Sequence, residues 1–173
     1  MIDFIRFSSK YLVRRMNEQD AEIILALCRG NPLFYEFAAA EPTLEQVLGD
    51  LRIAPPGVDM KDKYYLGFFE GAKLVAVMDL IDGYPKPEIA FIGFFMMDAA
   101  FQGRGIGSFI ILETAAHLRS VDKNSIRLGI DADNPQSIAF WRKNGFITIG
   151  ESENNGHRIF LSEKALNVDS NVV

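Results

Sequence analysis

Two segments in the first third of the chain place apolar residues at the three- and four-residue spacing of an amphipathic helix. The first follows a capping-box sequence at residues 17–20 and ends at the Gly-Asn-Pro of residues 30–32. Thr43 and Gln46 give a second capping signal before the other segment. The two apolar faces comprise Ile23, Ile24, Leu27 and Cys28, and then Leu44, Val47, Leu48 and Leu51. We expect two short helices, preceded by a strand over residues 11–16.

The middle of the chain changes to continuous apolar runs, which are typical of strands. Residues 64–69 and 73–81 form two such runs joined by a Glu-Gly turn, which predicts a hairpin. A turn over residues 82–87 leads to a third run, 88–97, which is apolar at nearly every position. Both faces of that strand are therefore expected to be covered.

The second half alternates helical and strand patterns after a glycine-rich turn. Asn134 and Pro135 open one helix as its N-cap and first residue, and Gly145 follows its end. The other expected elements are a helix over 106–118, a strand over 126–130 and an antiparallel pair over 146–150 and 157–161, with the chain after residue 165 fraying. This order predicts one mixed α/β domain with helices on both faces of its sheet.

The composition is that of an ordinary globular domain, because 49% of the 173 residues are hydrophobic and 24% are charged. A formal net charge of −5 argues against a nucleic-acid-binding surface. The lone cysteine, Cys28, excludes an internal disulfide, and no apolar run approaches the roughly 20 residues of a membrane span. The first residues lack the order of a signal peptide. We therefore expect a cytoplasmic protein without nucleic-acid or membrane partners.

The turn at residues 103–107 carries the most specific chemistry. Gly103, Gly105 and Gly107 open a helix, where unpaired amides and the helix dipole favour a phosphate or diphosphate. The dinucleotide pattern Gly-x-Gly-x-x-Gly fails because residue 108 is serine, and the lysine of a P-loop is missing. Three glycines in five residues cost more backbone entropy than a plain turn requires. A tight turn that binds no ligand is the simpler alternative.

Gln102, Gly105 and Gly107 follow the pattern Gln-x-x-Gly-x-Gly, and here the chain resembles the GNAT superfamily of N-acetyltransferases, whose acetyl-CoA motif follows the fourth strand. A second block, residues 134–146, is similar to the family's Asn-x-x-Ala…Tyr-x-Lys-x-Gly-Phe segment. The resemblance covers roughly residues 10–162 of a single domain. It implies a largely antiparallel, twisted sheet of six or seven strands flanked by about four helices, with acetyl-CoA as co-substrate.

The resemblance also implies where the co-substrate lies. In the family the fourth and fifth strands splay apart, and the pantetheine arm pairs with strand backbone in the gap. By position these backbone groups belong to Phe95 and Met97, and an amide near Phe95 would polarise the thioester carbonyl. The side chains of this stretch are expected in the core.

The remaining implied contacts come from the turn and the second block. The diphosphate would lie on the turn amides with Arg104 nearby as a cation. Asn134 is either a plain helix cap or also a contact to the pantetheine arm, which Ser137 and Phe140 would line; Trp141 packs on the arm or in the core. The full implied set is Phe95, Met97, Gln102, Gly103, Arg104, Gly105, Ile106, Gly107, Ser108, Asn134, Ser137, Phe140 and Trp141.

The family's reaction is direct attack of an amine on the thioester, which needs a proton acceptor and often an acid for the departing thiolate. Trp141 stands where the family commonly has a tyrosine that acts as the general acid. An indole donates no proton near pH 7. Another group or water must then protonate the thiolate. The candidate bases are Asp79 and Tyr84 in the middle of the chain and Glu88 at the start of its third strand. A carboxylate within an apolar strand, as at Asp79, is costly unless paired or functional, whereas Glu88 is equally explained as an exposed strand end.

Other reactive side chains are given structural roles: His117 on a solvated helix face, His157 on a strand edge and Cys28 packed in a helix. The acceptor is expected near residues 33–37, Leu-Phe-Tyr-Glu-Phe, which suit either a small amine with an apolar body or helix packing. The acceptor is then a small-molecule or peptide amine, and a homodimer is compatible with the resemblance. The rival hypotheses are a non-catalytic acetyl-CoA-binding sensor or partner subunit, which Trp141 supports, and an interaction domain without cofactor.

Overall fold

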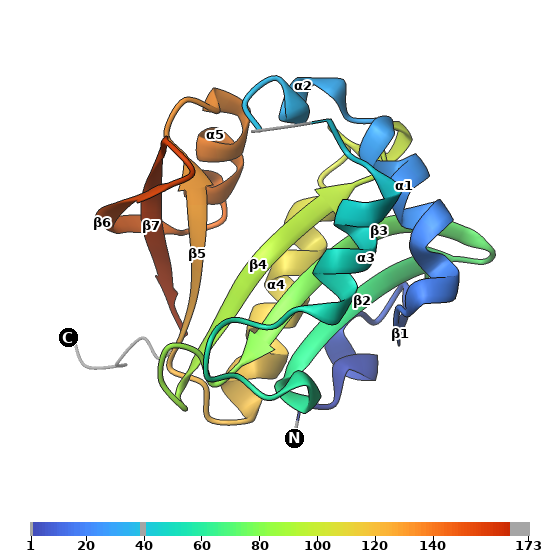
Figure 1. Ribbon diagram of the computed structural model, residues 1–173. Coiled ribbons are helices and arrows are strands. Elements are labelled where there is room, and N and C mark those ends of the chain that lie inside the picture. The colour runs from blue at the N-terminus through green and yellow to red at the C-terminus, as the bar shows by residue number, and fades with distance from the viewer. Residues whose placement is uncertain (1, 39–40, 167–173) are drawn as a thin grey trace.

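Seven strands form one open, twisted sheet in the order β1-β2-β3-β4-β5-β7-β6 (Figure 1). The computed structural model describes residues 2–38 and 41–166. All neighbouring strands are antiparallel except β4 and β5, which pair in parallel. The strands are β1 (Leu12–Arg15), β2 (Lys63–Glu70), β3 (Lys73–Asp82), β4 (Ile89–Met97), β5 (Ser125–Asp131), β6 (Ile147–Asn154) and β7 (His157–Ala165). The largely antiparallel sheet expected from the sequence is confirmed.

Helices cover both faces of this sheet, as the order of elements predicts. The helices are α1 (Ala21–Arg29), α2 (Pro32–Tyr35), α3 (Leu44–Arg52), α4 (Ile106–Ser120) and α5 (Pro135–Lys143). Figure 1 shows α1 and α3 in front of the sheet and α4 behind it. Thr43 caps α3 by accepting a hydrogen bond from the Gln46 amide, and Asn17 caps a 3₁₀ turn that leads into α1. Short 3₁₀ helices also cover Phe4–Phe7, Met60–Asp62 and Ala99–Phe101.

Two apolar clusters hold the layers together, one on each face. On the front face, Ile24 of α1 and Val47 of α3 pack against β2 to β4 through residues such as Val77. On the other face, Ile110 of α4 and Trp141 of α5 pack against β2 to β5. Alternation along the strands directs side chains to the two clusters in turn.

β4 and β5 are paired only at their beginnings. The parallel ladder joins residues 89–92 of β4 to residues 125–128 of β5, after which the two strands diverge (Figure 1). A bulge accompanies the divergence, because Asp79 of β3 pairs with Phe94 while Leu80 pairs with Ile92, which leaves Gly93 without an opposite residue. The second half of β4 therefore borders an opening on its β5 side.

Several sequence expectations differ from the structure in detail. β4 is covered on both faces, by Met96 in one apolar cluster and by Ala90 and Ile92 in the other, but Gly93 is exposed and Phe94 and Phe95 are only half-buried beside the opening. His117 does not lie on a solvated face; its ring packs on Phe7, with ring centroids 5.4 Å apart. Leu166, at the start of the tail expected to fray, is buried and donates its amide to Asn124; residues 167–173 lie outside the described part.

The final pair of strands also extends further than the apolar pattern indicates, to Asn154 in β6 and Ala165 in β7. Polar residues continue these strands because β6 forms an edge of the sheet and is exposed along most of its length. Within the described residues, no helix has the length and apolar character needed to cross a membrane.

Candidate functional site

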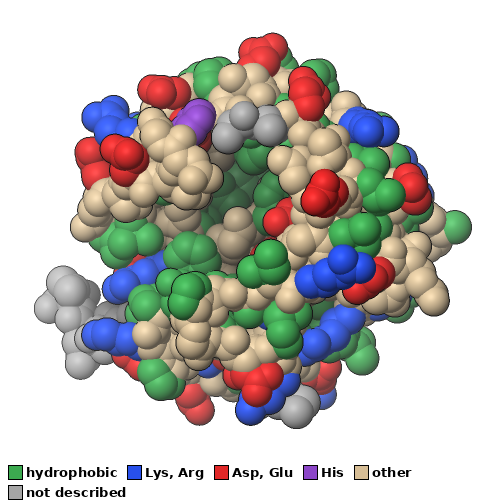
Figure 2. All heavy atoms as spheres, in the orientation of Figure 1, with side chains coloured by type: hydrophobic (Ala, Val, Ile, Leu, Met, Phe, Trp, Pro, Cys, Tyr) green, Lys and Arg blue, Asp and Glu red, His purple; other side chains and the backbone are tan. Residues whose placement is uncertain are grey.

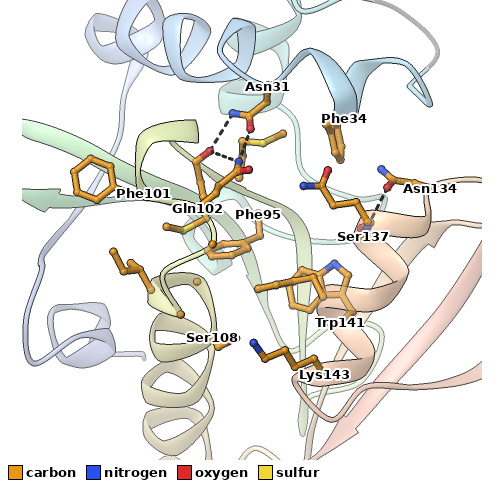
Figure 3. Close-up of a pocket in the computed structure, with 18 residues that line it drawn as sticks. Asn31, Phe34, Phe95, Phe101, Gln102, Ser108, Asn134, Ser137, Trp141 and Lys143 are labelled. Carbon is orange, nitrogen blue, oxygen red and sulfur yellow. Dashed lines mark hydrogen bonds between the residues drawn. The ribbon is translucent and has the colours of Figure 1, made fainter.

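A cavity of about 290 Å³ lies where β4 and β5 diverge. Figure 2 shows the face that carries α1 and α3 hollowed at its centre, with hydrophobic side chains at the base. The cavity is bounded by the end of β4, the start of α4, helix α5 and the segment from α1 to α2 (Figure 3). Its lining comprises Asn31, Phe34, Phe95, Met96, Met97, Phe101, Gln102, Gly103, Gly105, Ile106, Gly107, Ser108, Asn134, Gln136, Ser137, Phe140, Trp141 and Lys143.

The N-terminus of α4 opens onto this cavity with its backbone amides unpaired. Gly105 is the N-cap in the left-handed region at φ 76°, and Gly103 has φ 71°. A Cβ at either position would meet nothing within 4 Å, so it is the backbone conformation that favours glycine. Within the described chain, the amides of residues 103–108 have no hydrogen-bond acceptor. These amides and the positive end of the α4 dipole form a site for an anion.

Gln102, the first residue of the glycine motif, points away from the helix N-terminus and towards Asn31 (Figure 3). Its Nε2 donates to Asn31 Oδ1 at 2.5 Å and to the Met97 carbonyl at 3.2 Å. Asn31 Nδ2 donates to the same Met97 carbonyl and to that of Leu27. This triangle joins the end of β4, the glycine turn at residues 103–107 and the junction between α1 and α2.

Aromatic rings close the side of the cavity next to α5. Phe95 and Phe140 are stacked, with ring centroids 5.9 Å apart and planes 18° apart. Trp141 meets Phe95, Phe140 and Phe146 edge-on and is only 7% exposed. Trp141 is therefore both a core residue and part of the cavity wall.

The start of α5 contributes a polar edge to the cavity. Asn134 is almost fully buried and its Oδ1 accepts a hydrogen bond from the Ser137 amide, so it caps the helix. Lys143, in the last turn of α5, extends its ammonium towards Ser108 at the start of α4 (Figure 3). Arg104 does not line the cavity, and its guanidinium lies over the Phe101 ring.

The family profile of the acetyltransferase (GNAT) family matches residues 31–146, which include the whole cavity lining. The chain belongs to the acetyltransferase (GNAT) family. This confirms the resemblance carried by the glycine motif and the second block.

Individual GNAT proteins resemble this chain to different extents. The spermine/spermidine N(1)-acetyltransferase of Bacillus subtilis is 27% identical over 101 residues, which span 58% of this chain and 66% of that relative. An acetyltransferase of Salmonella typhimurium that modifies the N-terminal serine of ribosomal protein L7/L12 superposes with a TM-score of 0.72 at 21% identity, over 94% of this chain and 99% of that one. The PaiA N-acetyltransferase of Thermoplasma acidophilum, in complex with coenzyme A, has a TM-score of 0.65 at 19% identity, over 90% and 98% of the two chains. The two structures share the GNAT fold.

The three candidate bases of this GNAT protein occupy different places. Asp79 lies on the α1 side of β3, where its Oδ2 is 2.5 Å from the buried Lys63 ammonium. Its Oδ1 is buried and has no hydrogen-bond partner. Burial raises the pKa of Asp79, and the hydrogen bond and charge of Lys63 oppose that rise. A Cβ at Gly93 would stand 3.1 Å from Oδ2, so glycine at this position leaves room for the buried carboxylate, which does not line the cavity.

Tyr84 and Glu88 lie at the opposite end of β4 from the cavity. Both precede Ile89, where the strand begins, whereas the cavity is lined from Phe95 onwards. The Tyr84 ring packs edge-on against Phe91. The sheet thus brings only Asp79, among the three candidates, to the half of β4 that borders the opening.

The remaining reactive side chains have partners outside the cavity. Cys28 is buried in α1 against Tyr35, and burial raises the pKa of its thiol, which suits packing rather than nucleophilic attack. His157 Nδ1 lies 3.0 Å from Asp131 Oδ2. The described residues contain no cluster of side chains suited to a metal ion.

Five lining residues were not expected from the sequence: Asn31, Met96, Phe101, Gln136 and Lys143. Phe34 falls within residues 33–37, where the acceptor is expected. One signal was available for Asn31. Asn31-Pro32 repeats the Asn-Pro order that predicts α5, and it likewise begins a helix, α2, which carries Phe34 into the cavity. Because Gly30 precedes it, the same dipeptide predicts the end of α1 and not the start of α2.

Proposed function

We propose that this protein is an N-acetyltransferase that transfers the acetyl group of acetyl-CoA to a primary amine within a ternary complex. The observation that carries the proposal is the row of unpaired amides at the start of α4, opening onto the gap between β4 and β5. A diphosphate fits these amides, and the gap beyond them is lined by Phe95, Phe140 and Trp141, whose apolar rings suit a pantetheine arm.

The chain's own residues would hold the co-substrate in a defined way. The amides of residues 103–108 receive the diphosphate, and Lys143 adds a positive charge beside Ser108. The Met97 carbonyl already accepts from Asn31 and Gln102, so backbone pairing with the arm falls to Phe95. Phe140 and Trp141 exclude water from the gap.

Acetyl-CoA supplies an activated thioester, and the protein must place an amine against it and remove a proton. The hollow on the α1 and α3 face gives the amine access from the side opposite α4 (Figure 2). Asp79 lies on this face, with one oxygen free of hydrogen bonds and a pKa raised by burial, so it is our proposed proton acceptor. Trp141 provides no acid, and water protonates the departing thiolate.

For the acceptor we propose a small cationic amine. This class is supported by the Bacillus relative, which is named for spermine and spermidine. The Salmonella structural neighbour modifies a protein N-terminus, which makes a peptide amine the competing class.

The proposal is tested by coenzyme A release from acetyl-CoA in the presence of spermidine, free amino acids, aminoglycosides and N-terminal peptides. We expect turnover with a polyamine. Turnover only with peptides would overturn the acceptor class. Binding of acetyl-CoA without turnover on any amine would instead support the sensor hypothesis, for which Trp141 in place of tyrosine is the specific observation.

The cofactor assignment has its own test, a Gly105→Val variant compared with Gly57→Val. Both glycines have positive φ and open surroundings, but only Gly105 belongs to the cavity. We expect both variants to fold, with acetyl-CoA raising the melting temperature of the Gly57 variant and not of the Gly105 variant. Equal shifts in both would contradict the backbone site.

A further inference from the structure

Asn31 is buried at the junction of α1 and α2, and every one of its polar atoms is engaged. Its amide donates to Cys28 and its carbonyl accepts from the Phe34 amide at 3.1 Å, the first hydrogen bond of α2. Its Nδ2 bridges the Leu27 and Met97 carbonyls, at 2.9 and 3.0 Å. Asn31 therefore connects the last turn of α1, the last residue of β4 and the beginning of α2.

Gln102 adds to this connection the glycine turn at residues 103–107, the proposed cofactor site, which we call the cofactor turn. An amide side chain has two N–H donors, and Gln102 directs its donors to Asn31 Oδ1 and to the Met97 carbonyl. What remains free on this side chain is an acceptor oxygen, which a phosphate would repel. Gln102 thus stands next to the anion site without a side-chain donor to offer it.

The other end of the connection is the acceptor side of the cavity. Phe34 follows Asn31 by three residues, lines the cavity and meets Phe94 edge-on, with ring centroids 5.9 Å apart. Helix α2 is a single turn held by few hydrogen bonds, so its position depends on how firmly Asn31 is held.

We propose that Asn31 and Gln102 are positioning residues that couple the cofactor turn to α2, so that cofactor binding orders the acceptor side of the cavity. The inference rests on the proposed function, because it takes coenzyme A to be the ligand of the turn. An anion on the amides of residues 103–108 fixes the turn that carries Gln102, Gln102 fixes Asn31, and the Asn31 carbonyl fixes the first turn of α2. By thermodynamic linkage, an occupied acceptor side tightens cofactor binding by the same factor.

Amide hydrogen exchange of α2 measures this coupling with coenzyme A as the probe. The reporting amides are those of Phe34, Glu36 and Phe37, which donate to Asn31, Pro32 and Phe34 carbonyls. In the wild-type protein, saturating coenzyme A should slow their exchange by about 5-fold or more, the lower end of typical coupling factors. In Gln102→Met, coenzyme A should still bind the backbone amides, but the slowing should be lost.

Two comparisons separate coupling from general loosening. A purely structural role for Gln102 would speed α2 exchange equally with and without coenzyme A and leave the ratio unchanged. The matched control is Gln46→Met, which removes a side-chain bond to the Thr43 amide at the start of α3 and should keep the full ligand-dependent slowing.

The outcomes distinguish this inference from the proposed function. Coenzyme A that binds wild-type protein without slowing α2 exchange, or that slows it equally in Gln102→Met, overturns the coupling. Failure of coenzyme A to bind the wild-type protein at all overturns the proposed function instead. As a kinetic counterpart, Gln102→Met should raise the KM for spermidine by more than the KM for acetyl-CoA.

Discussion

Gly107 of α4 lies directly against the ring of Phe140 of α5. A Cβ at Gly107 would stand 3.2 Å from Cε2 and 3.3 Å from Cζ of that ring, and 3.5 Å from Met97 Cγ. The missing side chain lets the Phe140 ring reach α4 while it stacks on Phe95. Gly107 therefore shapes the wall of the cavity, whereas Gly103 and Gly105 allow the left-handed backbone conformation of the turn.

Gly107→Ala should push the Phe140 ring into the cavity. We expect a stability loss of about 1–2 kcal/mol from overpacking, together with weaker coenzyme A binding, measured by urea unfolding and calorimetric titration. Gly49→Ala is the matched control, because Gly49 lies within α3 with nothing within 4 Å of its Cβ position. That change should stabilise the protein by about 0.5–1 kcal/mol. Equal changes in stability for Gly107→Ala and Gly49→Ala would contradict the contact between Gly107 and Phe140.

Asp79→Asn should lower kcat/KM by about 10²–10⁴ if Asp79 accepts the proton. The substitution also leaves the Lys63 ammonium buried without its partner, which costs stability by about 3–5 kcal/mol. The double variant Asp79→Asn, Lys63→Met removes that stability cost. We expect it to recover folding without recovering turnover or the acid limb of the pH–rate profile. Recovery of turnover would show that Asp79 serves only as the partner of Lys63.

Trp141→Phe should leave kcat and its pH dependence nearly unchanged, because an indole supplies no proton that phenylalanine lacks. The smaller ring gives up packing against Phe95, Phe140 and Phe146, so thermal unfolding should show a loss of about 1–2 kcal/mol. Trp141→Tyr offers the complementary measurement. A kcat that rises with tyrosine and collapses with phenylalanine would show that position 141 takes part in proton transfer after all.

Asp20 should make stability depend on pH in acid. Its carboxylate accepts from both terminal nitrogens of Arg14 and from the Asn17 amide. The Arg14 hydrogen bonds lower the pKa of Asp20 below its ordinary value of 3.8, against the effect of burial. A lowered native pKa means stability that is complete above that ordinary value and lost as the pH falls through the native one.

Asp20→Asn should therefore cost about 1 kcal/mol in urea unfolding at pH 7, and this difference should shrink below pH 3.8. Arg14→Gln should flatten the same dependence, because it removes the group that lowers the pKa. If the stability lost in Asp20→Asn stays constant down to the acid transition, the effect of Asp20 comes from its hydrogen bond with the Asn17 amide alone.

Local patterns predicted most of the fold, since capping residues, apolar runs and the two motif blocks each depend on neighbours in sequence. Contacts between residues far apart in the sequence could not be predicted in this way. The Phe7 contact that covers His117 joins residues more than a hundred positions apart, and the separation of β4 from β5 is visible in the chain only through a family resemblance. Asn31 was overlooked because Gly30 before it suggested an ending, although Pro32 after it marks a beginning.

The divergence of β4 from β5 gives the sheet interior edges in addition to the outer edges at β1 and β6. An unpaired strand edge is a template for another chain, and this protein shields its interior ones with the Gly93 bulge, the Phe95 and Phe140 rings, and the side chains that cap the Met97 carbonyl. On the proposed function, the pantetheine arm lies along the same edge as a removable strand. Adding coenzyme A to the solution should then make the protein more resistant to aggregation.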